Sequence, residues 1–235
     1  MRVSTAQTII IEDSGMWFTS INKYKITDNF YATSFIEFRS NHFAKKSQYL
    51  FLSPGIGYKL GNHVSFVAGY MFVRGYVHYD SQSTLKRDEN RLWQKVSLKT
   101  MYKNVAISNR FVFEERFKSA IKTADGRYFI DGTTYAQRFR YRLTASFKIV
   151  ALKNSKYLLG KVSNELRIRF RTGISEPDFD QNNFNAYLGY QLFENSILWV
   201  GFQRDYYKVK SETFKANNIL NIKISYDFDF RKKAK

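Results

Sequence analysis

Apolar and polar residues alternate along most of the chain. Across residues 135–149 the odd positions are mainly apolar or aromatic, whereas the even positions carry arginine, lysine and hydroxyl side chains. Residues 220–230 alternate without exception. A period of two places the two sets on opposite faces of a β-strand. The pattern therefore predicts strands with one apolar face and one polar, largely cationic face.

The pattern recurs often enough to predict eleven strands. Besides the two segments above, it covers residues 16–26, 30–40, 48–60, 63–77, 90–102, 105–117, 157–171, 182–193 and 197–208. Strands of soluble proteins usually have about five or six residues, whereas about 9 to 11 tilted residues cross a bilayer. The length therefore favours a transmembrane β-barrel over a soluble β-sandwich, in which the alternation would look the same.

Short and long connections alternate between the predicted strands. The short ones are Thr27-Asp28-Asn29, Gly61-Asn62, Lys103-Asn104 and Glu194-Asn195-Ser196, and the long ones are 78–89, 118–133, 172–181 and 209–217. Outer-membrane barrels have short periplasmic turns and longer outer loops. We therefore expect an all-β fold, an antiparallel up-and-down transmembrane β-barrel of about twelve strands.

The twelfth strand would come from the N-terminal segment. With eleven strands the first and the last run the same way, so residues 7–14, with Ile9-Ile10-Ile11, have to cross the membrane region as well. They either form a short strand, which gives the even count typical of bacterial barrels, or thread through the lumen. We expect residues 1–6 to be a signal-peptide end or disordered. Residues 7–230 are expected to form the barrel, and residues 231–235 a basic periplasmic tail.

The formal net charge of the chain is +18. This excess of positive charge affects which side chains are expected to line the lumen. With the polar faces turned inward, the predicted basic lining is Arg39, Arg91, Lys95, Lys99, Arg110, Arg116, Arg138, Arg140, Arg142, Lys148, Lys161, Arg167, Arg169 and Arg171, and its acidic partners are Glu37, Glu114, Glu165 and Asp205. Unpaired charges need water or anions, since dry burial is costly. The lining predicts either a wet, salt-bridged filling or an anion-preferring pore.

Aromatic residues fall into two groups. Those near strand ends are expected at the membrane interface; they are Tyr135, Phe147, Tyr206, Phe228 and Phe230. Trp17 and Trp199 instead fall on inward-facing positions. They indicate either a register error in this interpretation or aromatic packing inside the lumen.

The order of several short segments resembles a known family. These segments are Trp17, Glu37-Phe38-Arg39, Asn90-Arg91-Leu92-Trp93-Gln94, Asn109-Arg110-Phe111, Glu115-Arg116-Phe117, Arg138-Phe139-Arg140-Tyr141-Arg142-Leu143, Asn164-Glu165, Phe179-Asp180-Gln181-Asn182 and Gly189-Tyr190-Gln191. In this order they are similar to the outer-membrane proteins grouped as domain of unknown function 2490, over roughly residues 15–230. The resemblance implies a barrel in the bacterial outer membrane and assigns no activity. The basic tail beyond Phe230 departs from barrels that end on an aromatic residue.

Patterns typical of catalysis or of metal and cofactor binding are weak. Among the three histidines, His78 with Asp80 and Ser81 is the only local constellation of the kind that an outer-membrane phospholipase needs. Neighbours in a loop rarely hold catalytic geometry. The chain has no cysteine. We therefore expect no enzyme, no metal site and no cofactor.

The sequence thus predicts a passive pore for small anionic solutes in the bacterial outer membrane. One alternative is a non-conducting accessory barrel that docks other outer-membrane proteins through loops 78–89 and 118–133, and another is a lipid hydrolase. Expected partners are outer-membrane lipid and lipopolysaccharide, and the barrel-assembly machinery during insertion. Nucleic acid is not expected, because the arginines and aromatic residues of 138–142 lie on opposite faces, whereas a stacking platform needs both on one.

Overall fold

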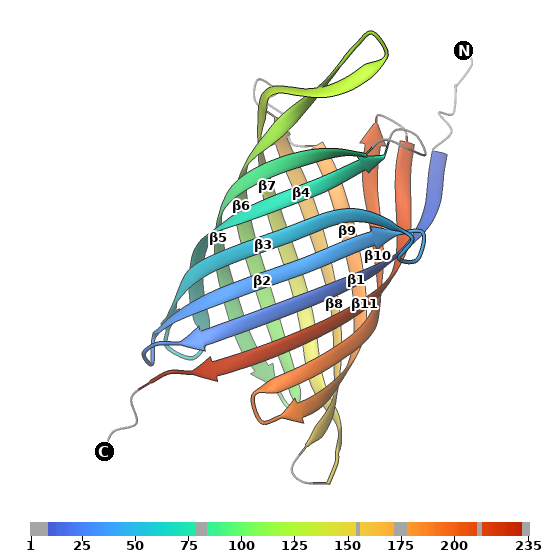
Figure 1. Ribbon diagram of the computed structural model, residues 1–235. Coiled ribbons are helices and arrows are strands. Elements are labelled where there is room, and N and C mark those ends of the chain that lie inside the picture. Colours follow the sequence, from blue (N-terminus) through green and yellow to red (C-terminus); the bar gives the residue numbers. More distant parts are fainter. Residues whose placement is uncertain (1–8, 79–83, 154–155, 172–177, 211–212, 232–235) are drawn as a thin grey trace, which may run out of the picture.

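The alternating segments form strands that close into one barrel (Figure 1). The computed structural model describes residues 9–78, 84–153, 156–171, 178–210 and 213–231. The strands are β1 (Ile9–Lys25), β2 (Phe30–Asn41), β3 (Lys46–Leu60), β4 (Val64–His78), β5 (Thr84–Tyr102), β6 (Val105–Ala124), β7 (Arg127–Ala151), β8 (Tyr157–Arg171), β9 (Asp178–Phe193), β10 (Ser196–Lys210) and β11 (Thr213–Asp229). In these residues no helix has the length and apolar character to cross a membrane. The prediction of an all-β barrel is confirmed.

The barrel closes through a parallel pair. Strands that follow one another in the chain pair antiparallel, whereas β1 and β11 pair parallel along their whole length, from Ile9 opposite Thr213 to Lys25 opposite Asp229. An odd number of up-and-down strands requires this, because the first and last strands point the same way. In the described residues, closure leaves no free sheet edge around the wall of the barrel, where each strand has a partner on both sides.

Residues 9–14 differ from both expectations for the N-terminal segment. They are neither a separate strand nor a luminal segment, because they continue β1 and pair with residues 213–218 of β11. They pair with β11 on one side only, because pairing of β1 with β2 begins at Gly15 opposite Asn41. Residues 1–8 and 232–235, which include the predicted signal-peptide end and most of the tail, lie outside the described residues. Arg231 forms ion pairs with Asp28 (2.7 Å) and Asp229 (2.5 Å).

The two ends of the barrel differ. One end, which we call the turn end, carries the short connections after β1, β3, β5 and β9 and the C-terminus (Figure 1). At the opposite hairpin end, β6 and β7 extend beyond the barrel as a long hairpin (Figure 1). The long connection expected over 118–133 is therefore strand for most of its length. Asp125 and Gly126 have positive φ angles of 50° and 71°, which suit the two-residue turn of a hairpin.

Apolar side chains cover the outside of the barrel. Large exposed ones on its strands include Phe18, Leu52, Ile56, Leu92, Leu143, Leu188, Val200 and Ile224. The aromatic residues predicted at the interface also point outward, and they pack in groups near the two ends. Phe228 stacks on Tyr24 at 5.0 Å near the turn end, and Tyr206 stacks on Phe214 at 4.9 Å near the hairpin end. Tyr135 packs against Phe117 at 5.1 Å.

Tryptophan rings pack inside the lumen, on backbone that glycines leave open. A Cβ atom at Gly189 would lie 2.5 Å from the ring of Trp199, and one at Gly69 would lie 2.5 Å from the ring of Trp93. Trp17 is buried as well. Of the two interpretations of Trp17 and Trp199, packing in the lumen therefore matches the structure, and the alternation assigned both side chains to the correct face.

Candidate functional site

The lumen contains a cavity of about 850 Å³ that is lined mainly by polar and charged side chains. Its cationic lining consists of Arg39, Arg87, Arg91, Lys95, Arg110, Arg116, Lys118, Arg138, Arg140, Arg142, Arg167, Arg169 and Lys223, and its acidic lining of Glu37, Glu89, Glu114, Asp180 and Asp205. The cavity reaches from Gln48 on the hairpin side to Ile21 in the turn-end half. Within the described residues, thirteen cationic side chains thus face five acidic ones.

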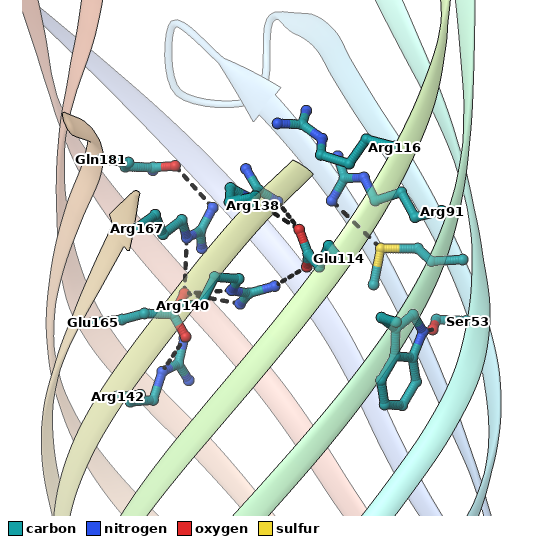
Figure 2. A network of polar contacts seen from close by, with 12 residues as sticks. Ser53, Arg91, Glu114, Arg116, Arg138, Arg140, Arg142, Glu165, Arg167 and Gln181 are labelled. Carbon is teal, nitrogen blue, oxygen red and sulfur yellow. Dashed lines mark hydrogen bonds and ion pairs between the residues drawn. The ribbon is translucent and has the colours of Figure 1, made fainter. Parts of the chain in front are cut away.

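Two buried glutamates organise the arginines on β6, β7 and β8 (Figure 2). Glu114, of which 1% is exposed, forms ion pairs with Arg138 (2.5 Å) and Arg140 (2.6 Å). Glu165, fully buried, contacts four arginines. Its partners are Arg110 (2.5 Å), Arg140 (2.8 Å), Arg142 (2.8 Å) and Arg167 (2.8 Å). Each carboxylate is surrounded by more positive charge than it can neutralise.

Strand register explains this arrangement. Glu114 lies directly opposite Arg138 in the β6–β7 ladder, and Glu165 lies opposite Arg142 in the β7–β8 ladder. Arg140 lies opposite Arg167, a like-charged pair that would be destabilising alone. Because residues two apart share a face, Glu165 reaches both of these arginines. The i, i+2 spacing of Glu165 and Arg167 therefore produces a contact, at 2.8 Å.

A β-bulge on β9 adds one polar side chain, Asp180, to the lumen beside Gln181. Arg167 lies opposite Gln181, but the next residue on β8, Ile168, lies opposite Phe179, so Asp180 is the extra residue. Both Asp180 and Gln181 consequently line the cavity. Asp180 contacts Arg138 at 3.2 Å, and Gln181 accepts a hydrogen bond from Arg167 at 2.8 Å.

The polar contacts continue around the barrel over β10, β11, β1 and β2. Gln181 and Gln203 donate to Asp205 at 2.9 and 2.6 Å, and Asn183 also contacts that carboxylate. Asn221 on β11 donates to Gln203 at 3.3 Å. These contacts join the β8 arginines to β11.

Glu37 continues the ring on β2. It accepts a hydrogen bond from Thr19 (2.9 Å) and pairs with Arg39 (2.6 Å). The guanidinium of Arg39 lies over the rings of Trp17 (3.6 Å) and Phe51 (4.3 Å). Arg91 lies 5.7 Å from the ring of Phe51, and Glu89 pairs with Arg91 (2.7 Å) and Arg116 (2.5 Å).

We call this ring the arginine belt. Its residues are Thr19, Glu37, Arg39, Glu89, Arg91, Arg110, Glu114, Arg116, Arg138, Arg140, Arg142, Glu165, Arg167, Asp180, Gln181, Asn183, Gln203, Asp205 and Asn221.

The structure places most of the predicted lining in this belt. All the predicted arginines except Arg171 line the cavity, and so do Glu37, Glu114 and Asp205, whereas Glu165 is buried beneath its arginines. Arg169 lies more loosely, 3.6 Å from Asp178 and 4.0 Å from Asp180. Arg171 ends β8, and its side chain is outside the described part of the chain.

Sequence reasoning missed Glu89 and Asp180. Both fall in segments that the alternation assigned to long connections, 78–89 and 172–181. A signal existed for Glu89, because it has the same parity as Arg91 and the strand continues to Thr84. No such signal existed for Asp180, since only the bulge turns it inward.

The histidines lie apart from the belt. His42 is in the turn between β2 and β3, with its Nδ1 3.5 Å from Asp13, and Nδ1 of His63 lies 3.0 Å from the carbonyl oxygen of Lys99. The side chains of His78, Asp80 and Ser81 lie outside the described residues. The expectation that the chain is no enzyme stays a prediction.

Comparisons with known proteins show to which family the chain belongs. A comparison with curated proteins finds no match. The model of one family, described as "Protein of unknown function (DUF2490)", matches residues 14–226. That range contains the whole arginine belt and all the segments that carried the resemblance. The match confirms the family resemblance, and the chain belongs to the DUF2490 family.

Proposed function

We propose that the protein is an outer-membrane β-barrel whose lumen lets small anions diffuse through. The observation that carries the proposal is the excess of cationic over acidic side chains around a cavity that follows the lumen. Rings of arginine and lysine attract anions and repel cations. An anion that enters lowers the repulsion among the unpaired charges, whereas a cation increases it.

The outside of the barrel supports an outer-membrane location. Closure pairs the backbone of every strand, which a spanning sheet needs in lipid. Exposed apolar residues cover the outer face, and aromatic residues gather near both ends, as in the girdles of outer-membrane barrels. In this orientation the turn end is periplasmic and the hairpin end faces outward. Lipid and lipopolysaccharide are then the immediate neighbours, and insertion requires the barrel-assembly machinery.

The arginine belt would set the size limit of such a pore. Glu89, Glu114 and Glu165 are buried and each pairs with two to four arginines, so these side chains have little freedom to move aside. The interior of a barrel of this size is only modestly wider than one that side chains fill. We therefore expect passage of small inorganic or carboxylate anions, not of oligosaccharides.

Conductance in planar bilayers tests the proposal. The purified barrel, shown to be folded by heat-modifiable migration on a gel, is added under a salt gradient. We expect steady single-channel steps and a reversal potential of the sign that chloride selectivity requires. A folded barrel that stays silent, or that prefers potassium, contradicts the proposal.

A specific observation also favours the accessory-barrel alternative. The hairpin extension exposes three consecutive large side chains, Tyr128, Phe129 and Ile130, with 46%, 40% and 39% of their surfaces accessible. Exposed apolar residues on a projecting element are typical of docking surfaces. We expect a bound partner to be lost on removing residues 121–130. Cross-linking in native membranes would detect it, and unchanged cross-linking of the shortened barrel would contradict docking through the hairpin.

A further inference from the structure

Cations in the two halves of the lumen have different partners. The belt arginines contact carboxylates. Lys95, Lys161 and Lys223, toward the turn end, have no carboxylate within 4.0 Å in the part of the chain that the structure describes. In the described residues, the lysines that form ion pairs are Lys122, Lys208 and Lys215. All three lie toward the hairpin end. Among the described residues, these three lysines are thus unpaired luminal cations of the turn-end half, whereas Arg87 and Lys118 are the cavity-lining cations without an ion pair at the hairpin end.

Each of these lysines lies over an aromatic ring. The Nζ atom of Lys161 is 3.5 Å from the ring centroid of Trp199, and that of Lys95 is 5.4 Å from Trp93. Nζ of Lys223 is 4.4 Å from the ring of Tyr187 and donates to its hydroxyl at 3.3 Å. A ring stabilises an ammonium group by about 0.5 to 2 kcal/mol but provides no negative charge. The rings therefore position the ammonium groups and leave their charge uncompensated.

The three lysines are also close enough to repel their cationic neighbours. Arg142 interacts electrostatically with Lys95, Lys161 and Lys223, and Arg110 with Lys95 and Lys223. Glu37 is the acid that acts on Lys223, but Thr19 and Arg39 already occupy its oxygens. These cations come from β5, β6, β7, β8 and β11, so they converge from different sides of the lumen.

An unused donor points to a missing acceptor. Nε of Arg110 is buried and has no hydrogen-bond partner among the described residues, although its Nη2 contacts Glu165 at 2.5 Å. Buried donors are rarely left unpaired. An acceptor in the adjacent cavity, which Arg110, Arg142, Lys95 and Lys223 all line, would satisfy it.

We propose that Lys95, Lys161, Lys223, Arg110 and Arg142 form a binding site for a phosphate group. A monovalent anion compensates one of these charges. A phosphate carries about two charges near neutral pH and offers several oxygens, so it can accept from several ammonium groups and a guanidinium at once. The phosphate group belongs either to free inorganic phosphate or to a small phosphate ester. We call these five residues the phosphate site.

The proposal deepens the proposed pore function, since a permeating phosphate would pass this site, but binding itself needs access from only one end of the lumen. Isothermal titration of the folded barrel in detergent measures binding without conduction. The ligands are inorganic phosphate and glycerol phosphate, with chloride as background salt. We expect both phosphates to bind in preference to chloride.

Matched variants locate the binding. Lys95→Gln and Lys223→Gln each remove one charge from the site and are expected to weaken phosphate binding about tenfold or more. Lys122→Gln, the same change in the hairpin outside the lumen, is expected to leave binding unchanged. Heat-modifiable migration shows which variants fold. A wild-type barrel that folds but does not bind phosphate overturns the proposal, as does equal affinity of folded Lys95→Gln, Lys223→Gln and Lys122→Gln barrels.

The titration and the conductance measurement test the phosphate site and the pore independently of each other. A silent barrel that binds phosphate, with loss of binding in Lys223→Gln, retains the site and contradicts the pore. A conducting barrel whose chloride current is unaffected by phosphate, and which binds none, retains the pore and contradicts the site. Equal affinity for both ligands identifies the bare phosphate group as what is recognised. Stronger binding of glycerol phosphate identifies a phosphate ester.

Discussion

Arg140 on β7 donates two hydrogen bonds to Glu165 on β8, from Nε at 3.1 Å and Nη2 at 2.8 Å. Its third nitrogen, Nη1, contacts Glu114 on β6 at 2.6 Å. One guanidinium therefore joins the two most buried carboxylates of the belt, across three strands (Figure 2). This geometry makes Arg140 the side chain on which the belt most depends.

Replacing Arg140 by Gln is expected to lower the free energy of unfolding by about 1 to 3 kcal/mol, because it removes hydrogen bonds to two buried carboxylates, although Glu165 keeps three arginines and Glu114 keeps Arg138. Urea unfolding in lipid vesicles, followed by tryptophan fluorescence, measures the change. Arg204→Gln is the control. Arg204 pairs with Glu12 outside the lumen, with both side chains about half exposed, so a loss of less than about 1 kcal/mol is expected. Equal losses in both variants would show that the belt does not hold the barrel together.

Selectivity is best tested at Arg169, whose ion pairs are the loosest in the lumen. Arg169→Glu reverses a luminal charge without removing a tight contact. At about 8 Å in water, a change of two charges alters the energy of a passing ion by about 1 kcal/mol. Chloride is disfavoured and potassium favoured by this amount, so we expect the chloride-to-potassium permeability ratio to fall by up to about thirtyfold, as measured from the reversal potential. Lys122→Glu makes the same reversal in the hairpin. A ratio that moved equally in both variants would place Arg169 off the conducting path.

Tryptophan packing gives a test of the interior. Gly189→Ala places a Cβ atom 2.5 Å from the present position of the Trp199 ring, and overpacking of this kind costs about 1 to 3 kcal/mol. Trp199→Leu removes the ring, so the double variant is expected to lose less stability than the sum of the single variants. Additive losses, measured by urea unfolding, would contradict packing of Trp199 on Gly189.

The amount of this architecture that the sequence predicts depends on how local each feature is. The strict period of two near Leu220 predicted β11, and the parity of Arg138, Arg140 and Arg142 predicted which side chains share a face. Strand ends were harder, because Glu89 and Asp180 stand where alternation stops. The hairpin signal at Asp125-Gly126 was overlooked, although this dipeptide favours such turns.

Features that join distant strands have no counterpart in alternation. Nothing in the spacing of Lys95, Lys161 and Lys223 shows that they converge, because the register between strands and the closure of the barrel determine their distances. The pairing of β1 with β11 is of the same kind. Alternation predicts which side chains of a strand share a face, but it does not predict which strands are neighbours.

The parallel closure itself is testable, and the absence of native cysteines makes the test clean. Ser20 on β1 lies opposite Ile224 on β11, so Ser20→Cys with Ile224→Cys is expected to form an intramolecular disulfide in the folded barrel. The matched pair, Ser20→Cys with Tyr226→Cys, lies about 7 Å out of register along the strand, which exceeds the reach of a disulfide. Peptide mass spectrometry after mild oxidation distinguishes the two. If a separate twelfth strand lay between β1 and β11, neither pair would cross-link within one chain, because that strand would hold the two cysteines about 10 Å apart.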